Sequence, residues 1–452
     1  MVDVQQDFQV SERLERFRTW PWPYTVLVIV GAAYFFGLFD VLTIGTAAPT
    51  IGAQMGVAGE VVASNGTVFS LVGYAVGAFL FSHISDTLGR KRGLTVSLIA
   101  YSVGSILTAT ATDITQVYVW RFVTGIGIGA DLAIAAAYLS ELAPHNNRGK
   151  FQSLGTFFGF TGAGVAPLIG YFLIPPLDIG WRIFFIIGAL GGIFVLFIRK
   201  NVPESPRWLL SKGRAKEASE LLDKIEITYK SKYGDLPPLS EMKAEIVESE
   251  MKVPLLHLFS KKHGLRLALV LAVFLFYYLY TYPFLALTTS LLVHSGFSIV
   301  ASLFMVGLGG LGYAVGAFSA FLTTERIERK YLISILFVLQ GICMFGIAIK
   351  LNTAEIIISD FFGSLTNTFL ATTLYVYAAE NFPTRARSNG VAATDGVGHL
   401  APVFGLPFMI GFFGMNGFFN TYLLIGIIAI VGGIVVLAGI RSTGRKLEEL
   451  SE

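Results

Sequence analysis

The sequence predicts an all-α membrane protein with twelve transmembrane helices arranged in two six-helix halves. Three observations lead to this prediction. Apolar residues make up 54% of the 452 residues and charged residues only 14%, whereas soluble domains carry about 25% charged residues. The apolar residues form twelve long runs, and the heptapeptide GYAVGAF occurs at 73–79 and again at 312–318.

Each apolar run is long enough, or nearly so, to cross a bilayer. The hydrocarbon core is about 30 Å thick and a helix rises about 1.5 Å per residue, so about 20 residues span it. A spanning backbone must satisfy its own hydrogen bonds, which favours helices. In chain order the runs are 24–51, 62–82, 93–111, 116–139, 153–174, 181–198, 265–293, 299–323, 331–349, 354–378, 390–412 and 418–440.

The distribution of basic residues predicts the orientation of the chain. With the helices placed as above, all but three of the 33 Lys and Arg residues lie on one side of the membrane. The exceptions are Arg121, Arg182 and Lys350. Basic short loops stay in the cytoplasm, so both termini are expected there, in a multi-pass protein of the cell membrane. The run at 24–51 is too long for a signal peptide and is kept as the first helix.

These patterns divide the chain into five parts. They are a cytoplasmic N-terminal tail (1–23), an N-terminal six-helix half (24–200), a cytoplasmic linker with amphipathic helices (201–263), a C-terminal six-helix half (264–440) and a cytoplasmic C-terminal tail (441–452). In the linker, the segment SPRWLLSKGRAKEASELLDKI is expected to be helical, with Ser205 as its N-cap and Pro206 at the first helical position. The single Cys343 excludes a disulfide within the chain.

The heptapeptide belongs to a longer internal repeat, in which residues of the first half match residues 239 positions later. At this offset Asp86 matches Glu325 and Arg90 matches Arg329. Further along, Tyr138, Glu141, Pro144 and Arg148 match Tyr377, Glu380, Pro383 and Arg387. Two repeats in the same orientation are typical of many secondary transporters.

Several motifs resemble those of the major facilitator superfamily, and the resemblance covers nearly the whole chain. The loop at 82–91 is similar to the family's G-x-x-x-D-[RK]-x-G-R-[RK] motif, with Ser82 and Thr87 at two of its positions. The segments RFVTGIGIG (121–129), YLSELAPHNNRG (138–149) and PESPRWL (203–209) resemble the sugar-porter branch and its relatives, the proton symporters of aromatic acids, organic ions and phosphate. The resemblance implies the major facilitator fold, with two pseudo-symmetric halves, and transport of a solute.

Charged residues at the cytoplasmic helix ends are expected to form a gate. Arg90, Glu141 and Arg148 are expected to form an ion-pair cluster that is mirrored in the second half. Asp86 is expected to face the positive N-terminal end of helix 11, and Glu325 that of helix 5. The alternative is that these charges are solvated and serve only topology. The complete set is Asp86, Arg90, Glu141 and Arg148 in the first half, and Glu325, Arg329, Glu380 and Arg387 in the second.

Ionisable residues inside the membrane are costly and usually functional. Asp40 lies in the middle of the first helix and Arg121 in the fourth, both in the outer half of the bilayer. An Asp beside an Arg keeps its charge, and it gains a proton more easily once the pair is broken. The resemblance to the sugar porters implies that these two residues pair for proton coupling; the alternative is a static buried salt bridge. Asp131, at the end of GIGIGAD, is a second candidate for proton coupling.

Further polar residues lie in the helices of the second half. Asp360 is placed close to the outer interface, where hydration would account for it. Its helical face continues to Asn367 and is expected to line the cavity. Asp395 and His399 lie one helical turn apart, within reach of each other. They form either a proton relay or a packed, hydrogen-bonded histidine.

The stretch FYYLYTYPF in the seventh helix is expected to line the substrate cavity, with Tyr278 and Tyr282 in contact with the solute. Tyrosine offers an apolar ring and a hydroxyl donor, which suits a sugar ring or an aromatic acid. Gln152 and Thr156 in the fifth helix are the other polar candidates, although Gln152 lies near enough to the cytoplasmic end to serve only as a cap. The paired glutamines and the helix-7 asparagine of sugar porters are missing, which argues against a hexose.

Together these observations predict a proton-coupled secondary transporter that imports a small polar organic solute, such as a sugar or an organic or aromatic acid, by alternating access. Its expected partners are the solute, protons and the lipid bilayer, without a cofactor, a metal ion or nucleic acid, and it is expected to act as a monomer. No nucleophile–base pair or phosphate loop is visible, which argues against an enzyme or an ATP-driven pump. The alternatives are an uncoupled facilitator, a proton-driven exporter, and a nutrient sensor that does not move solute.

Overall fold

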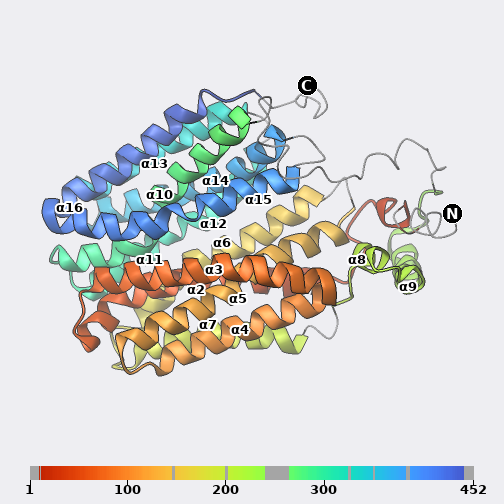
Figure 1. Ribbon diagram of the computed structural model, residues 1–452, viewed down its shortest axis with the longest axis horizontal. Helices are drawn as coiled ribbons and strands as arrows, with labels where there is room; N and C mark the ends of the chain where they lie inside the picture. The colour runs from red at the N-terminus through yellow and green to blue at the C-terminus, as the bar shows by residue number, and fades with distance from the viewer. Residues whose placement is uncertain are drawn as a thin grey trace.

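The computed structural model describes residues 10, 12–144, 148–198, 202–239, 264–323, 327–349, 352–382 and 387–441 (Figure 1). Within these residues all of the regular secondary structure is helical. The first half contains α2 (Tyr24–Met55), α3 (Gly59–Leu88), α4 (Arg90–Thr110), α5 (Ile114–Leu142), α6 (Arg148–Leu173) and α7 (Gly180–Ile198). The linker contains α8 (Pro206–Ser211) and α9 (Ala215–Tyr233). The second half contains α10 (Gly264–His294), α11 (Ile299–Gly310), α12 (Gly312–Thr323), α13 (Arg329–Ile349), α14 (Thr353–Asn381), α15 (Arg387–Gly398) and α16 (Ala401–Val436).

Twelve membrane crossings follow one another along these helices. Nine helical stretches of the described residues are long and apolar enough to cross a bilayer. The last of them, 390–436, contains two crossings, because α16 is interrupted at Gly417, where φ is 74°. The shorter apolar helix α7 and the 29-residue helix α14 supply the remaining two. The predicted all-α membrane fold of twelve helices is therefore confirmed.

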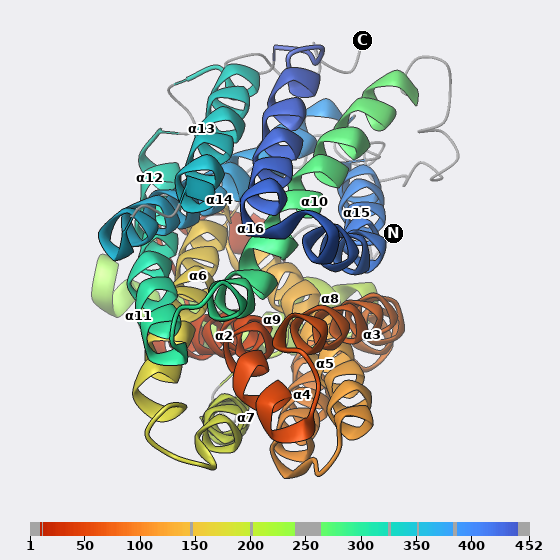
Figure 2. The same cartoon turned by 90° about the vertical axis from the view of Figure 1, so that its left-hand side faces the viewer.

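The two halves lie against each other with their helices running in roughly the same direction (Figures 1 and 2). They meet where α2, α3 and α6 pack against α10, α11, α12 and α16. The linker helices α8 and α9 lie at one end of the bundle, which we call the linker end. The opposite end is called the far end.

The repeated heptapeptide makes the same helix contact in each half. A Cβ atom on Gly73 would lie 2.1 Å from the carbonyl oxygen of Phe122, and one on Gly312 would lie 2.0 Å from that of Phe361. The second glycine of each copy, Gly77 or Gly316, is equally close to a carbonyl oxygen four residues further along the same partner helix. Small residues of this kind allow membrane helices to approach closely. The repeat therefore preserves the α3–α5 contact and its counterpart between α12 and α14.

Three segments that the sequence predicts as single helices are broken in the structure. The crossing at 299–323 divides at Leu311 into α11 and α12, next to a cluster of glycines. The linker helix divides into α8 and α9 because Gly213 adopts a left-handed conformation, with φ of 68°. The crossing that begins with α15 is interrupted at 399–400. The start of the linker helix is as predicted, since the hydroxyl of Ser205 accepts a hydrogen bond from the backbone N–H of Trp208.

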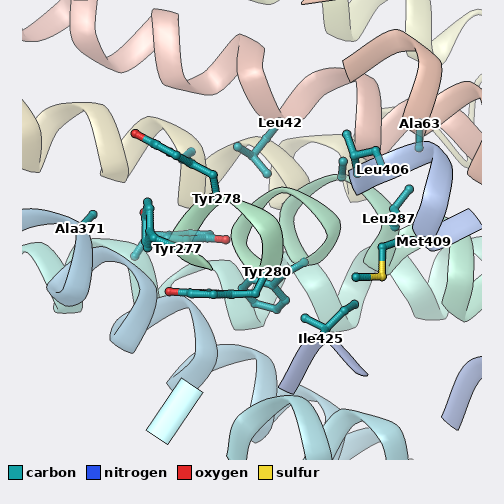
Figure 3. Close-up of a cluster of buried hydrophobic side chains, with 14 of the residues drawn as sticks. Leu42, Ala63, Tyr277, Tyr278, Tyr280, Leu287, Ala371, Leu406, Met409 and Ile425 are labelled. Atoms are coloured by element: carbon teal, nitrogen blue, oxygen red, sulfur yellow. The ribbon is translucent and has the colours of Figure 1, made fainter. Parts of the chain in front are cut away.

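The buried apolar side chains form two clusters. The larger one joins both halves, and Figure 3 shows part of it, with Leu42 and Ala63 from the first half facing Leu287 and Leu406 from the second. The smaller one lies in the first half and at the linker end, where side chains of the N-terminal segment, including Trp20, pack against α6 and α9. The linker is therefore held against the N-terminal half.

Candidate functional site

A large cavity lies between the two halves. Its volume is about 1080 Å³, and its walls come from α2, α3, α5 and α6 on one side and α10, α12, α14 and α15 on the other. The lining residues run from the middle of these helices towards the linker end, where the exposed Lys150 and Phe321 are among them. A cavity of this size is sufficient for a small organic molecule.

Tyrosine is the most prominent side chain of the cavity wall. Four of the lining tyrosines come from α3 and α10, one comes from α14, and the other two come from α2 and α12. Figure 3 shows Tyr277, Tyr278 and Tyr280 leaving α10 in different directions, and of these three only Tyr277 and Tyr278 line the cavity. The seven lining tyrosines are Tyr34, Tyr74, Tyr277, Tyr278, Tyr282, Tyr313 and Tyr375.

A carboxylate lies at the centre of the aromatic wall. The hydroxyl groups of Tyr278 and Tyr375 both donate to Oδ1 of Asp395, each at 2.5 Å. Nδ1 of His399 lies 3.3 Å from the same oxygen. The imidazole ring also lies tilted against Tyr278, at a centroid distance of 3.9 Å, and stacks on Tyr74 of the other half, at 5.0 Å. The predicted neighbours Asp395 and His399 are thus together, in a packed and hydrogen-bonded arrangement on the cavity wall.

A second charged pair lies deeper, within the first half. Nη1 of Arg121 donates to Oδ2 of Asp40 at 2.7 Å, and both side chains are fully buried by their neighbours. Ser105 donates to the other carboxylate oxygen at 2.6 Å, and Nε of Arg121 donates to the hydroxyl of Ser70 at 3.1 Å. Arg121 and Ser70 also line the cavity. The pair is therefore packed within the first half and borders the cavity through Arg121.

The remaining predicted contacts occupy different places. Thr156 and Tyr282 line the cavity, as does Asn367, whose amide donates to the hydroxyl of Thr281 at 2.9 Å. Gln152 lines it as well, but its amide is already bound to the carbonyl oxygen of Ala136 at 2.5 Å.

Asp131 does not line the cavity. Its carboxylate is buried and accepts a long hydrogen bond of 3.4 Å from Ser97. Among the described residues, no hydrogen bond or ion pair joins Asp131 to Asp40 or Arg121.

The sequence that forms this site matches a known protein family. Residues 24–452 match the model of a family described as "Sugar (and other) transporter". The chain belongs to this family. This sugar-transporter family member is 31% identical to the putative metabolite transport protein YyaJ of Bacillus subtilis, over 92% of each chain. It is 28% identical to the niacin transporter NiaP of Acinetobacter baylyi, over 97% of this chain and 98% of that one.

The fold is also similar to that of a solved structure. The chain superimposes on the xylose transporter XylE from E. coli, in a partially occluded inward-open conformation, with a TM-score of 0.74 and 17% identity, over 93% of this chain and 100% of that one. The protein is therefore a multi-pass membrane transporter of the major facilitator superfamily, related to the sugar porters, and not an enzyme. Among the described residues no group of three or more metal-ligating side chains gathers at one place.

The expected gate residues of this family member are only partly within the described structure. Arg90 pairs with Glu141 at 2.8 Å, and their repeat counterparts Arg329 and Glu380 pair at 3.1 Å. Glu325 and the side chains of Arg148 and Arg387 lie outside the described residues.

Asp86 is also engaged within its own half. Its side chain is 64% exposed and pairs with Arg90 at 2.5 Å. The expected approach of Asp86 to the start of helix 11 stays a prediction.

Two features of the site were not predicted from the sequence. Tyr375 and Tyr74 contact the Asp395–His399 pair from other helices, and no local spacing connects them to it. Glu204 accepts a hydrogen bond from the backbone N–H of Arg90 at 2.9 Å and so joins the linker to the Arg90–Glu141 pair. The PESPRWL segment that contains Glu204 was the available signal.

Asp360 also differs from the sequence prediction. Placement near the outer interface predicted a hydrated carboxylate, yet the residue is only 2% exposed. The reason is that α11 packs directly over it, since Gly309 leaves room for its side chain.

Proposed function

We propose that this transporter is a proton-coupled symporter that imports a small polar organic solute by alternating access. The buried pair of Asp40 and Arg121 carries the proposal. A carboxylate and a guanidinium removed from water attract each other strongly, but each is costly when left alone. A proton on Asp40 neutralises the carboxylate and frees Arg121, which borders the cavity, to interact with the solute. In this way the arrival of a proton and the binding of a solute favour the same state.

The aromatic wall supports an aromatic acid as the solute. Seven tyrosines offer ring faces and hydroxyl donors, and aromatic rings attract one another by offset or edge contacts. The relative NiaP is described as a transporter of niacin, which is an aromatic acid. The side-chain amide of Gln152 already donates to a backbone carbonyl oxygen. The cavity wall therefore offers few free amide groups to the hydroxyl groups of a hexose.

The orientation of the chain is also part of the proposal. Basic loops favour placing the linker end, with both termini, in the cytoplasm of a cell whose plasma membrane the protein spans. The cavity then opens to the cytoplasm in the present structure, and the ion pairs at Arg90 and Arg329 belong to the gate that closes it in the outward-open state. One chain contains the whole cavity, which supports function as a monomer.

The substrate class is tested by thermal unfolding of the purified protein. A ligand that binds only the folded state stabilises it by about 2.7 kcal/mol at a concentration of 100 times its Kd. We expect niacin and related aromatic acids to raise the unfolding temperature, and xylose to leave it unchanged. A shift with xylose alone would place the solute among the sugars.

Coupling is tested with Asp40→Asn in proteoliposomes. The variant lacks the proton-binding carboxylate but keeps a similar shape. We expect it to lose uphill accumulation driven by a pH gradient and to retain exchange of solute across the membrane. Asp40→Glu should restore part of the accumulation, and the exposed Asp178→Asn provides the control.

Two results would contradict this proposal. Accumulation by Asp40→Asn at the wild-type level would remove Asp40 from the coupling path. A wild-type protein that equilibrates solute without response to any ion gradient would be a facilitator. Leaving a buried charge unpaired costs about 3–5 kcal/mol, so each variant is first checked for a monodisperse folded state.

A further inference from the structure

Asp360 is a buried carboxyl group without a cation. It lies in α14 and is 2% exposed. In the internal repeat it occupies the position of Arg121, and the position of Asp40 is taken by Leu279. The second half thus keeps an ionisable group at this place but has lost the partner. Within the described part of the chain, no Lys, Arg or His forms an ion pair with Asp360, and no donor forms a hydrogen bond with its carboxyl group.

The carboxyl group packs against a contact between the two halves. A Cβ atom on Gly309 of α11 would lie 1.9 Å from Oδ2 of Asp360. The next residue, Gly310, faces Gly164 of α6 so closely that a Cβ on Gly164 would lie 2.4 Å from the carbonyl oxygen of Gly310. The break between α11 and α12 follows at Leu311. Asp360 therefore lies directly behind the place where α11 touches the other half.

The groups around Asp360 are uncharged. The phenols of Tyr313 and Tyr422 and the thiol of Cys343 are in electrostatic range, from α12, α16 and α13 respectively. Among the described side chains, no charged group of any packed helix acts on Asp360. An ionised carboxylate enclosed in this way would lack both water and a counter-charge, and burial of that kind favours the neutral, protonated form.

We propose that Asp360 is a second proton-binding site, located in the C-terminal half and separate from Asp40. The carboxylate takes up one proton from water at the far end and becomes a carboxylic acid, without any other bond forming or breaking. The proton is retained while α11 packs on α6, and it returns to water when that contact opens. Protonation of Asp360 therefore favours the arrangement in which the halves are closed over it. The inference goes beyond the proposed coupling at Asp40, because it assigns a proton to the other half.

Infrared difference spectroscopy of the full-length protein in lipid tests the proposal directly, because a protonated carboxylic acid has a carbonyl absorption that a carboxylate lacks. We expect the wild-type protein at neutral pH to show this absorption. In Asp360→Asn its intensity should fall by the contribution of one protonated carboxyl group. Glu355→Gln, a change of an acid at the start of the same helix, should keep it. Equal absorption in the wild type and in Asp360→Asn would overturn the proposal.

The fold of the variant supplies a second test. Asparagine resembles the neutral acid in shape, so Asp360→Asn should fold and should unfold at the wild-type temperature at neutral pH. A variant that fails to fold would show that the negative charge is part of the native structure, which also overturns the proposal. Both measurements are made without solute and without a gradient. Their outcome therefore does not depend on whether the proposed symport is correct.

Discussion

At the scale of single residues, the site shows which contacts a sequence can reveal. Asp395 and His399 are one helical turn apart, and the structure places them in contact. The pair of Asp40 and Arg121 followed from a family resemblance, because 81 residues separate them and spacing carries no information over that distance. Tyr375 remained unrecognised because its partner is on a different helix, and only the packing of α14 against α15 brings them together.

Tyr375→Phe removes one hydroxyl group from the Asp395 network and leaves the ring in place. A hydrogen bond to a charged group contributes about 1.5–3 kcal/mol, and we expect the free energy of unfolding to fall by an amount in this range or below it, because Tyr278 still donates to the same oxygen. The measurement is the thermal unfolding temperature in detergent. Tyr171→Phe serves as the control, and an equal shift in both variants would show that the hydroxyl of Tyr375 contributes nothing specific.

At the scale of elements, the hydrophobic runs in the sequence located the membrane crossings, and the repeated glycines allow the close contacts between neighbouring helices. The apolar runs predicted the helices well because a membrane imposes a minimum length on each one. They did not reveal the breaks at Leu311 and Gly213, since a broken helix can be as apolar as a continuous one. The repeat revealed more than the hydropathy did, because its glycines are constrained by the backbone of the neighbouring helix.

Gly77→Ala and Gly316→Ala test these contacts in the two halves. The added methyl group would lie 1.9 Å from the carbonyl oxygen of Ile126 in the first case and 2.2 Å from that of Leu365 in the second. Overpacking of this kind costs about 1–3 kcal/mol, so both variants should unfold at lower temperature than the wild type. Gly411→Ala, in a helix position with open space around it, should be neutral or slightly stabilising. A neutral effect in all three would mean that the helices can separate without cost.

The attachment of the N-terminal segment to α9 depends on charge as well as on apolar packing. Glu226 accepts from Arg13 and pairs with Arg16, each at 2.7 Å. Partial burial acts to raise the pKa of Glu226, but the hydrogen bonds from the two arginines outweigh it, so the pKa lies below its ordinary value. The stabilisation that follows is complete above the pKa of the unfolded chain and is lost as the pH falls through the lower, folded pKa.

We therefore expect the N-terminal segment to loosen only in acid, below about pH 4. Tryptophan fluorescence reports this, because Trp20 and Trp22 are buried in the same cluster. In Glu226→Gln the acid transition should disappear and the segment should be held less firmly at neutral pH. Glu220→Gln, on the same helix, is the control. A transition that persists unchanged in Glu226→Gln would assign it to another group.

At the scale of the whole molecule, the repeat predicted two halves, and the family match and fold confirm them. The sequence contained no information about which end of the cavity is open, because a state open at the linker end and a state open at the far end would use the same helices. In the structure the described ion pairs at the linker end, at Arg90 and Arg329, each stay within one half. At the far end a pair joins the halves: Nδ1 of His294 in α10 lies 3.1 Å from Oε1 of Glu60 in α3.

This far-end pair should contribute to keeping the far end closed. The side chain of Glu60 is 10% exposed and that of His294 is 56% exposed, and pairs open to solvent contribute about 0.2–1 kcal/mol. Glu60→Gln should therefore raise the population of the state open at the far end by up to about fivefold, since 1.4 kcal/mol corresponds to tenfold. Spin labels on cysteines introduced at Ala58 and Val300, in a Cys343→Ser background, measure the distance across this end. Glu355→Gln is the control, and an unchanged distance distribution in Glu60→Gln would show that apolar packing between α2, α3 and α10 closes the far end without help from this pair.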